Sequence, residues 1–211
     1  LLKKVQEDKF DESYDQVISF GELISTQIVS QYLLLDSIEN EWVDARNFIK
    51  TDNTWREGKV DLDWTAQLVQ REIVPILQEK IIITQGFLGG TLGNKTTTLG
   101  REGSDYSASI FAYCLDAQKV CIWKDVAGVL NADPKKISDT QLYETLSYQE
   151  AAEMTFYGAN VIHPKTIKPL ANKNIPLYVK SFLEPQKEGT CIDGIASPQE
   201  TPTIIFKSEQ V

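Results

Sequence analysis

Residues 80–115, KIIITQGFLGGTLGNKTTTLGREGSDYSASIFAYCL, form the stretch that decides the fold. It opens on a continuous apolar run, passes through a glycine-rich segment and ends in a pattern with helical spacing. Such an apolar run is typical of a strand buried on both faces of a parallel sheet. We therefore expect a strand over 80–84, a ligand-binding loop after it, and a helix over about 106–115 that Ser104 and Asp105 cap.

The flanking sequence repeats this alternation of strands and helices. Apolar spacing predicts helices over about 20–36 and 63–78, with Pro75 bending the second near its end. Two S-x-x-E capping boxes, Ser19 with Glu22 and Ser147 with Glu150, mark helix starts, and the second helix should end near Gly158. Pro164 is placed to begin another helix. Further strands are expected over 42–45, 119–123, 175–180 and 203–206.

This alternation predicts an α/β fold with a mostly parallel sheet covered by helices on both faces. Ligands of such folds bind at the carboxyl ends of the strands. Residues from Thr84 onward and from Trp123 onward should therefore carry the chemistry, because both stretches are rich in Gly, Ser, Thr, Asp and Arg. At 211 residues one domain is the default expectation, and the polar tail after Gly194 resembles a linker.

Composition and charge exclude several classes of protein. A net charge of −9 argues against nucleic acid or an anionic membrane as a partner. No apolar run approaches the roughly 18 residues of a membrane span, and the first residues lack a signal-peptide layout, so a soluble, cytosolic protein is expected. His163 is the only histidine and the three cysteines lack C-x-x-C spacing, which disfavours zinc enzymes, triad hydrolases and a protein metal site.

The densest candidate site is TTTLGREGSD, residues 96–105. Gly100 and Gly103 allow the backbone to approach a ligand, and Arg101 offers a planar fork to a carboxylate or phosphate. The amino end of the following helix favours anions. An ordinary glycine-rich loop with a surface arginine and an aspartate cap remains the alternative, since short glycine motifs are weak evidence.

Several blocks in order give a more specific signal than any one of them. SFGELIST near the start, ITQGFLGG, TTTLGREGSDYSASI, DVAGVLNADP and SYQEAAEMTFYGANVIHP together resemble the aspartokinase group of the amino-acid kinase family. The resemblance covers about residues 19–192. It implies a three-layer αβα sandwich and the transfer of the γ-phosphoryl group of ATP, carried with Mg²⁺, to the side-chain carboxylate of L-aspartate. That reaction begins the synthesis of lysine, threonine and methionine.

The resemblance also implies roles on the aspartate side of the site. Glu22 would bind the amino group of aspartate and Arg101 its α-carboxylate. Phe87 would make backbone contacts near the substrate, and Asp105 would orient the lysine that neutralises the transferred phosphoryl group. Three of these residues have a structural alternative: Glu22 as a capping-box glutamate, Phe87 as a core residue and Asp105 as a helix cap.

On the nucleotide side, the resemblance places Asp125, Gly128, Asp133 and Lys135 around ATP, although a plain Asp, Gly and Pro turn would also explain DVAGVLNADP. Three positions there depart from many relatives, namely Lys124, Leu130 and Asn160. A lysine is gained at 124 and one is lost at 160, so we hypothesise that Lys124 replaces the missing phosphate-binding cation.

The family's opening K-F-G-G-T-S motif does not occur in this sequence. The chain starts at Leu1 without an initiator methionine, so we interpret it as part of a longer protein: residues 1–193 as a partial kinase domain and 194–211 as a linker toward a regulatory ACT region. By itself it is expected to be inactive, because phosphoryl transfer depends on cations placed around the phosphate. Feedback inhibition and the family's homo-oligomer contacts are expected to belong to the ACT region.

Two other functions remain open. The chain could be a nucleotide-binding α/β module without catalysis, which the missing motif suggests. It could also be another amino-acid kinase, acting on glutamate, acetylglutamate or a uridylate. The LGREGSD and SYQEAAEM blocks favour aspartokinase over these.

Overall fold

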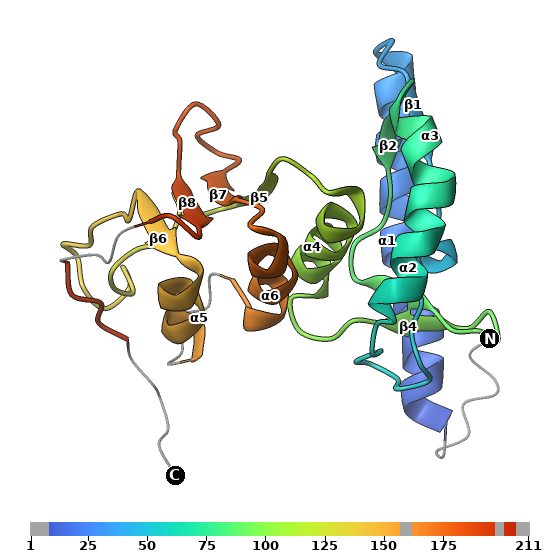
Figure 1. Cartoon of the computed structure of the whole chain (residues 1–211), viewed down its shortest axis with the longest axis horizontal. Coiled ribbons are helices and arrows are strands. Elements are labelled where there is room, and N and C mark those ends of the chain that lie inside the picture. The colour runs from blue at the N-terminus through green and yellow to red at the C-terminus, as the bar shows by residue number, and fades with distance from the viewer. Residues whose placement is uncertain (1–8, 157–161, 197–200, 206–211) are drawn as a thin grey trace. The chain divides into compact units, whose positions relative to one another are not determined.

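The computed structural model describes residues 9–156, 162–196 and 201–205. The chain divides into two compact units, residues 1–115 and 116–211, here called the N-terminal and C-terminal units. Figure 1 shows the order of their elements. Whether residues 1–193 make one kinase domain stays a prediction.

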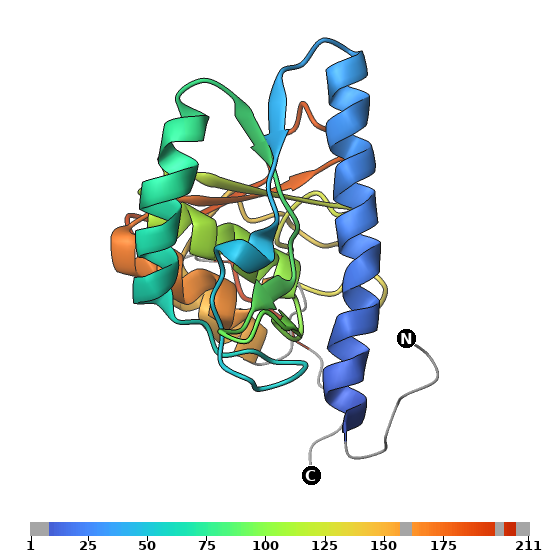
Figure 2. The ribbon, with the colours of Figure 1, turned by 90° about the vertical axis from the view of Figure 1, so that its right-hand side faces the viewer.

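The N-terminal unit combines helices with two small sheets. Its elements, in chain order, are α1 (Phe10–Leu35), β1 (Asn40–Trp42), the 3₁₀ turn Ala45–Asn47, α2 (Leu62–Leu68), the π-helical turn Val69–Ile73, α3 (Val74–Leu77), β2 (Ile81–Ile83), β3 (Leu88–Gly90), β4 (Thr96–Thr98) and α4 (Gly103–Leu115). Strands β1 and β2 pair in parallel, and β3 and β4 form an antiparallel hairpin. Figure 2 shows β1 and β2 between α1 and the α2–α3 helix.

The core of this unit lies on the side of the α2–α3 helix and α4. It is a cluster of buried apolar residues: Val43, Phe48, Ile49, Val69, Ile73, Leu99, Ile110 and Cys114. The predicted helix over 63–78 is confirmed, with the irregularity near Pro75 taking the form of the π-helical turn just before it. Proline has no N–H to donate to the carbonyl four residues earlier, which explains the wider turn.

Helix α1 differs most from the sequence prediction. It begins at Phe10, so Ser19 lies inside the helix, where its hydroxyl donates to the carbonyl of Gln16 at 3.0 Å, and the predicted Ser19–Glu22 capping box is wrong. The apolar stripe used to predict the helix is exposed, with Ile28 at 63% and Tyr32 at 65%. The buried side chains of α1 are polar instead: Asp15, Ser19 and Ser30.

Other element boundaries around the glycine-rich segment also differ from the sequence prediction. The β3–β4 hairpin lies where a loop was expected, and the expected strand over 80–84 shortens to β2, whose Ile81 is 54% exposed. Burial on both faces was therefore a wrong expectation for Ile81. Ser104 and Asp105 lie in the first turn of α4 and do not precede it, so their prediction as caps was off by one to two residues.

The C-terminal unit is a four-stranded sheet with two helices. Its elements are β5 (Val120–Lys124), β6 (Thr145–Ser147), α5 (Tyr148–Phe156), α6 (Pro164–Lys173), β7 (Leu177–Ser181) and β8 (Thr190–Asp193). The strand order is β5-β7-β8-β6; β5 with β7 and β6 with β8 are parallel, and β7 with β8 is antiparallel. Strands β6 and β8 were not predicted. Ile204, in the expected strand over 203–206, forms an isolated bridge with Ala132, and residue 206 lies outside the described residues.

The local signals for α5 and α6 are confirmed. The carboxylate of Glu150 accepts hydrogen bonds from the backbone N–H and the hydroxyl of Ser147, at 2.9 and 2.7 Å, and the N–H of Glu150 donates to the Ser147 hydroxyl at 3.1 Å. Pro164 is the first residue of α6. The expected helix end near Gly158 lies outside the described residues.

The α/β class is confirmed, and three of the five strand pairings are parallel. No disulfide joins cysteines within the described residues, where Cys114 is buried and Cys121 exposed. The described helices include none long and apolar enough to cross a membrane.

Candidate functional site

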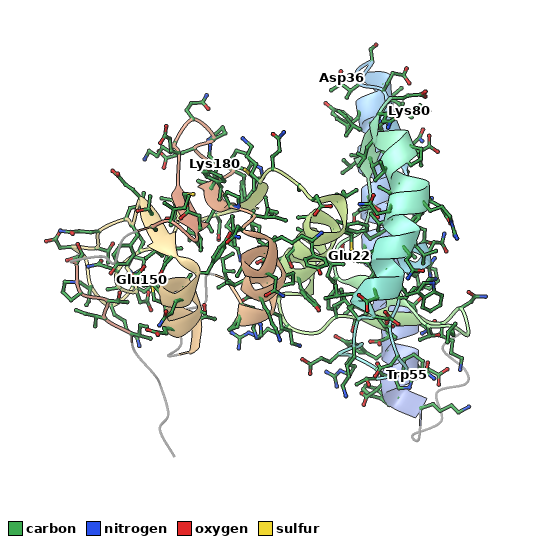
Figure 3. All side chains as sticks on the ribbon, in the orientation of Figure 1. Glu22, Asp36, Trp55, Lys80, Glu150 and Lys180 are labelled. Carbon is green, nitrogen blue, oxygen red and sulfur yellow. The ribbon has the colours of Figure 1, made fainter. Side chains whose placement is uncertain are left out.

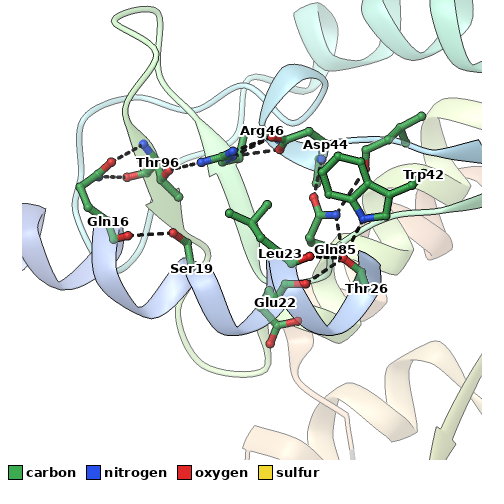
Figure 4. A network of polar contacts seen from close by, with 12 residues as sticks. Gln16, Ser19, Glu22, Leu23, Thr26, Trp42, Asp44, Arg46, Gln85 and Thr96 are labelled. Carbon is green, nitrogen blue, oxygen red and sulfur yellow. Dashed lines mark hydrogen bonds and ion pairs between the residues drawn. The ribbon is translucent and has the colours of Figure 1, made fainter. Parts of the chain in front are cut away.

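In the N-terminal unit, the two parallel strands end at the same edge, and a buried glutamine holds those ends together. Gln85, 1% exposed, follows β2. Its Oε1 atom accepts a hydrogen bond from the backbone N–H of Ala45, just after β1, at 2.9 Å, and its Nε2 atom donates to the hydroxyl of Thr26 on α1 at 2.9 Å (Figure 4). One side-chain amide thus fixes both strand ends against α1.

The same network fixes the helical turn that carries Glu22. The Thr26 hydroxyl donates to the carbonyl oxygen of Glu22 at 2.8 Å and accepts from Nε1 of Trp42 at 3.0 Å. Glu22 lies midway along α1 (Figure 3), and its carboxylate points away from Thr26 and Gln85 (Figure 4). Within the described residues that carboxylate makes no hydrogen bond or ion pair, so it is available to a cationic ligand.

Phe87 and the loop before α4 are held together by close packing. The N–H of Leu99 donates to the carbonyl of Phe87 at 2.9 Å. A Cβ atom at Gly103 would lie 2.6 Å from Cδ2 of Phe87, so only glycine fits where the ring meets α4. Gly100 and Glu102 have φ angles of 77° and 53°, and the exposed Arg101 between them projects from this tight turn.

Asp105 lies in the first turn of α4, half-buried, with its Oδ2 atom buried. A carboxylate there is favoured by the helix dipole. The backbone N–H of Phe87 donates to the hydroxyl of Ser107 in the same helix at 2.8 Å, so hydrogen bonds hold both backbone groups of Phe87. The structure therefore brings Phe87, Arg101 and Asp105 to the start of α4, and ties Glu22 to the same strand end through Thr26 and Gln85.

Sequence reasoning missed a charged pair in this region. Arg46 donates to both carboxylate oxygens of Asp44, at 2.6 to 3.1 Å, and to the hydroxyl of Thr96 at 3.0 Å (Figure 4). The hydrogen bond to Asp44 raises the pKa of Arg46 despite its partial burial. Burial lowers the pKa of Lys50, whose ammonium donates to the carbonyl of Arg46 at 3.0 Å. Only the D-x-R spacing at the end of the predicted strand over 42–45 could have indicated this pair.

The nucleotide-side candidates belong to the C-terminal unit. Lys124 is the half-buried last residue of β5, and Asp125 follows it exposed. Gly128 has a φ of 151°, and a Cβ atom there would lie 2.5 Å from the hydroxyl of Thr190. That hydroxyl accepts from the N–H of Val129 at 2.8 Å, so the turn is fixed against β8.

The rest of this loop is mostly exposed. The carboxylate of Asp133 accepts from the backbone N–H of Lys135 at 2.9 Å, as the plain-turn alternative expects, while both side chains lie at the surface. Leu130 is half-buried and forms an isolated bridge with Leu142. Asn160 lies outside the described residues.

A mostly parallel α/β fold with glycine-rich turns and charged groups at the strand ends is typical of proteins that bind small ligands at the carboxyl ends of their strands. The chain belongs to the amino acid kinase family, whose sequence model matches residues 2–181. This confirms the family expected from the motifs.

Among its relatives, the chain is 37% identical to lysine-sensitive aspartokinase 3 of Escherichia coli K12, over 84% of this chain and 40% of that protein. It is 35% identical to the aspartokinase of Chlamydia muridarum, over 94% of this chain and 46% of that protein. The crystal structure of E. coli aspartokinase III in complex with aspartate and ADP matches with a TM-score of 0.86 and 35% identity, over 89% of this chain and 42% of that one. The resemblance to aspartokinases is thus confirmed, and the chain spans less than half the length of these relatives.

Proposed function

We propose that this chain is part of the catalytic domain of an aspartate kinase, which transfers the γ-phosphoryl group of ATP to the side-chain carboxylate of L-aspartate. That reaction would supply the activated acid for lysine, threonine and methionine synthesis. The observation that carries the proposal is the grouping of Glu22, Phe87, Arg101 and Asp105 in one unit, in a chain similar to aspartokinases.

The charges of this group suit a small amino acid. The Glu22 carboxylate would bind the ammonium group of aspartate, and the Arg101 guanidinium its α-carboxylate. The network through Thr26 and Gln85 supports this proposal, because a specific site needs its charged groups on rigid supports. Asp105 would then face the phosphoryl-transfer side and orient the lysine of the family's K-F-G-G-T-S motif.

The nucleotide would lie against the C-terminal unit. We propose that Lys124 and Lys135 approach the phosphates, that Asp125 and Asp133 line the nucleotide pocket, and that Leu130 and Asn160 lie at its border. Gly128 would shape the turn, and its lack of a side chain is already required by Thr190. Mg²⁺ would arrive on the ATP phosphates, as it does where substrate phosphates supply part of its coordination.

The test uses the complete protein, because the 211 residues lack the K-F-G-G-T-S motif and are expected to be inactive alone. Purified protein with MgATP should release ADP in the presence of L-aspartate, and hydroxylamine should trap the acyl phosphate as a hydroxamate. Glutamate, acetylglutamate and UMP serve as the competing acceptors. ADP release with one of these and not with aspartate would overturn the proposed substrate.

The second candidate, a nucleotide-binding module without catalysis, depends on that missing motif. It predicts ATP binding with no ADP release with any of the four acceptors. Sequencing the gene upstream of Leu1 gives an independent answer, because an encoded K-F-G-G-T-S segment would remove the reason for this candidate.

A further inference from the structure

Helix α1 buries a carboxylate that the proposed function does not use. Asp15 is 0% exposed. Its Oδ2 atom accepts hydrogen bonds from the backbone N–H groups of Arg56 at 2.8 Å and Thr98 at 3.0 Å, and its Oδ1 atom accepts from the hydroxyl of Thr98 at 2.8 Å. One side chain thus joins α1 to the loop after β1 and to the end of β4.

Burial of a carboxylate is costly unless hydrogen bonds replace its water. Here three donors do so, and two of them are backbone N–H groups that can only donate. Arg56 adopts a φ of 64°, a left-handed conformation uncommon for residues other than glycine, while its N–H bonds to Asp15. The local backbone is therefore arranged around this carboxylate.

The next residue of α1 holds the same strand. The side-chain amide of Gln16 donates to the carbonyl of Thr96 at 2.7 Å and accepts from the N–H of Thr96 at 3.1 Å (Figure 4). This is the pair of bonds that a neighbouring strand would make. Asp15 and Gln16 together hold both ends of β4 against the helix.

The position of Asp15 links two groups of the candidate site. Glu22 lies seven residues further along α1, which is about two turns or roughly 10 Å along the helix axis. Arg101 follows Thr98 by three residues, through Leu99, which is 1% exposed and bonded to Phe87. The short backbone segment from Thr98, which contacts Asp15, to Arg101 is therefore closely constrained.

We infer that Asp15 is a positioning residue that sets the spacing between Glu22 and Arg101, and so between the groups that bind the amino and α-carboxylate ends of the amino acid. This inference rests on the proposed function of the site. A purely structural role would instead lower stability and affect both substrates alike.

The test compares Asp15→Ala, Asp15→Asn and Ser30→Ala in the complete protein. Ser30 is a matched control: it is 2% exposed on the same helix, and its hydroxyl donates to the side-chain oxygen of Asn40 in β1 at 2.6 Å, not to β4. Asp15→Ala should raise the KM for aspartate up to roughly 100-fold, the effect of a misplacement of about 1 Å, with the KM for ATP little changed. Calorimetry should show the same selective loss of aspartate binding.

Asp15→Asn should recover most of the affinity. Its amide oxygen can accept the two backbone N–H bonds, and its NH₂ group can donate to the Thr98 hydroxyl. Thr98→Val removes only one of the three bonds, so it should weaken aspartate binding less and in the same direction. If Asp15→Ala does not fold, Thr98→Val still tests the positioning role.

Equal losses for aspartate and ATP in Asp15→Ala or Thr98→Val, or an Asp15→Ala effect no larger than that of Ser30→Ala, would overturn the positioning role while wild-type activity stands. A wild-type protein that neither binds nor phosphorylates aspartate would overturn the proposed function and this inference with it.

Discussion

The two units hold their candidate residues in different ways. In the N-terminal unit, the buried polar side chains of Gln85 and Asp15, which are 1% and 0% exposed, hold the segments that carry Glu22 and Arg101. In the C-terminal unit, Asp133 and Lys135 are exposed and are joined by a turn hydrogen bond, while Gly128 packs against Thr190. The difference teaches that substitutions should act through geometry in the first unit and through single charges, or loss of fold at Gly128, in the second.

Replacing two glycines gives the largest expected contrast. Gly128→Ala combines a strained φ with a Cβ atom 2.5 Å from Thr190, and each effect costs about 1 to 3 kcal/mol. Gly21→Ala, inside α1 with nothing within 4 Å, should stabilise by about 0.5 to 1 kcal/mol. Denaturant unfolding followed by circular dichroism measures both. A tolerated Gly128→Ala would mean that the loop can move away from β8.

Arg101→Lys tests the aspartate side of the comparison. Lysine keeps the charge but loses the planar fork, so the KM for aspartate should rise much more than that for ATP. A loss of about 1.5 to 3 kcal/mol of binding is the scale of a hydrogen bond to a charged group. Steady-state kinetics with each substrate varied in turn provide the measurement. Equal changes in both KM values would indicate a role in folding.

Lys124→Ala tests the nucleotide side. If Lys124 replaces the cation that relatives carry at the position of Asn160, its loss should weaken ATP binding by ~1 to 3 kcal/mol. Adding Asn160→Lys should then restore part of the affinity. Calorimetric titration with ATP compares the single and double variants with wild type. An unchanged affinity in Lys124→Ala, or no recovery in the double variant, would leave the exchange without function.

Replacing Tyr148 should have the smallest effect, which is on the stability of the C-terminal unit and not on substrate binding. Burial, helped by Asp193 and Cys191, raises its pKa from 10.0 to about 12, and its hydroxyl donates to the carbonyl of Ile175 at 2.6 Å. The folded state favours the protonated phenol, so this stabilisation is complete below pH 10 and is lost as the pH approaches 12.

Tyr148→Phe should therefore lower stability by about 0.5 to 1.5 kcal/mol at pH 8, with the difference from wild type shrinking between pH 10 and 12. Thermal unfolding of both proteins across this range is the measurement. A constant difference at all pH values would show that the phenol does not titrate in this way.

The sequence predicted those features that depend on neighbouring residues. The Ser147–Glu150 capping box and the Pro164 helix start are confirmed because both partners of each contact lie within one helical turn. The same S-x-x-E pattern at Ser19 misled, since α1 begins at Phe10 and the pattern cannot show that a helix has already started. The collinear motifs identified the family.

Only the tertiary structure decided how the candidate residues are held. Gln85 joins two strand ends and a helix, and Asp15 contacts a residue 83 positions away, so no local pattern marks either. From the sequence alone, the Gln85 amide and the Asp15 carboxylate would be expected at the surface, because a sequence shows that a side chain is polar but not that it is buried. The apolar stripe of α1 shows the converse. Its spacing identified the helix, but within the described residues α1 buries the polar side chains of Asp15 and Ser30, because these form hydrogen bonds with β4 and β1.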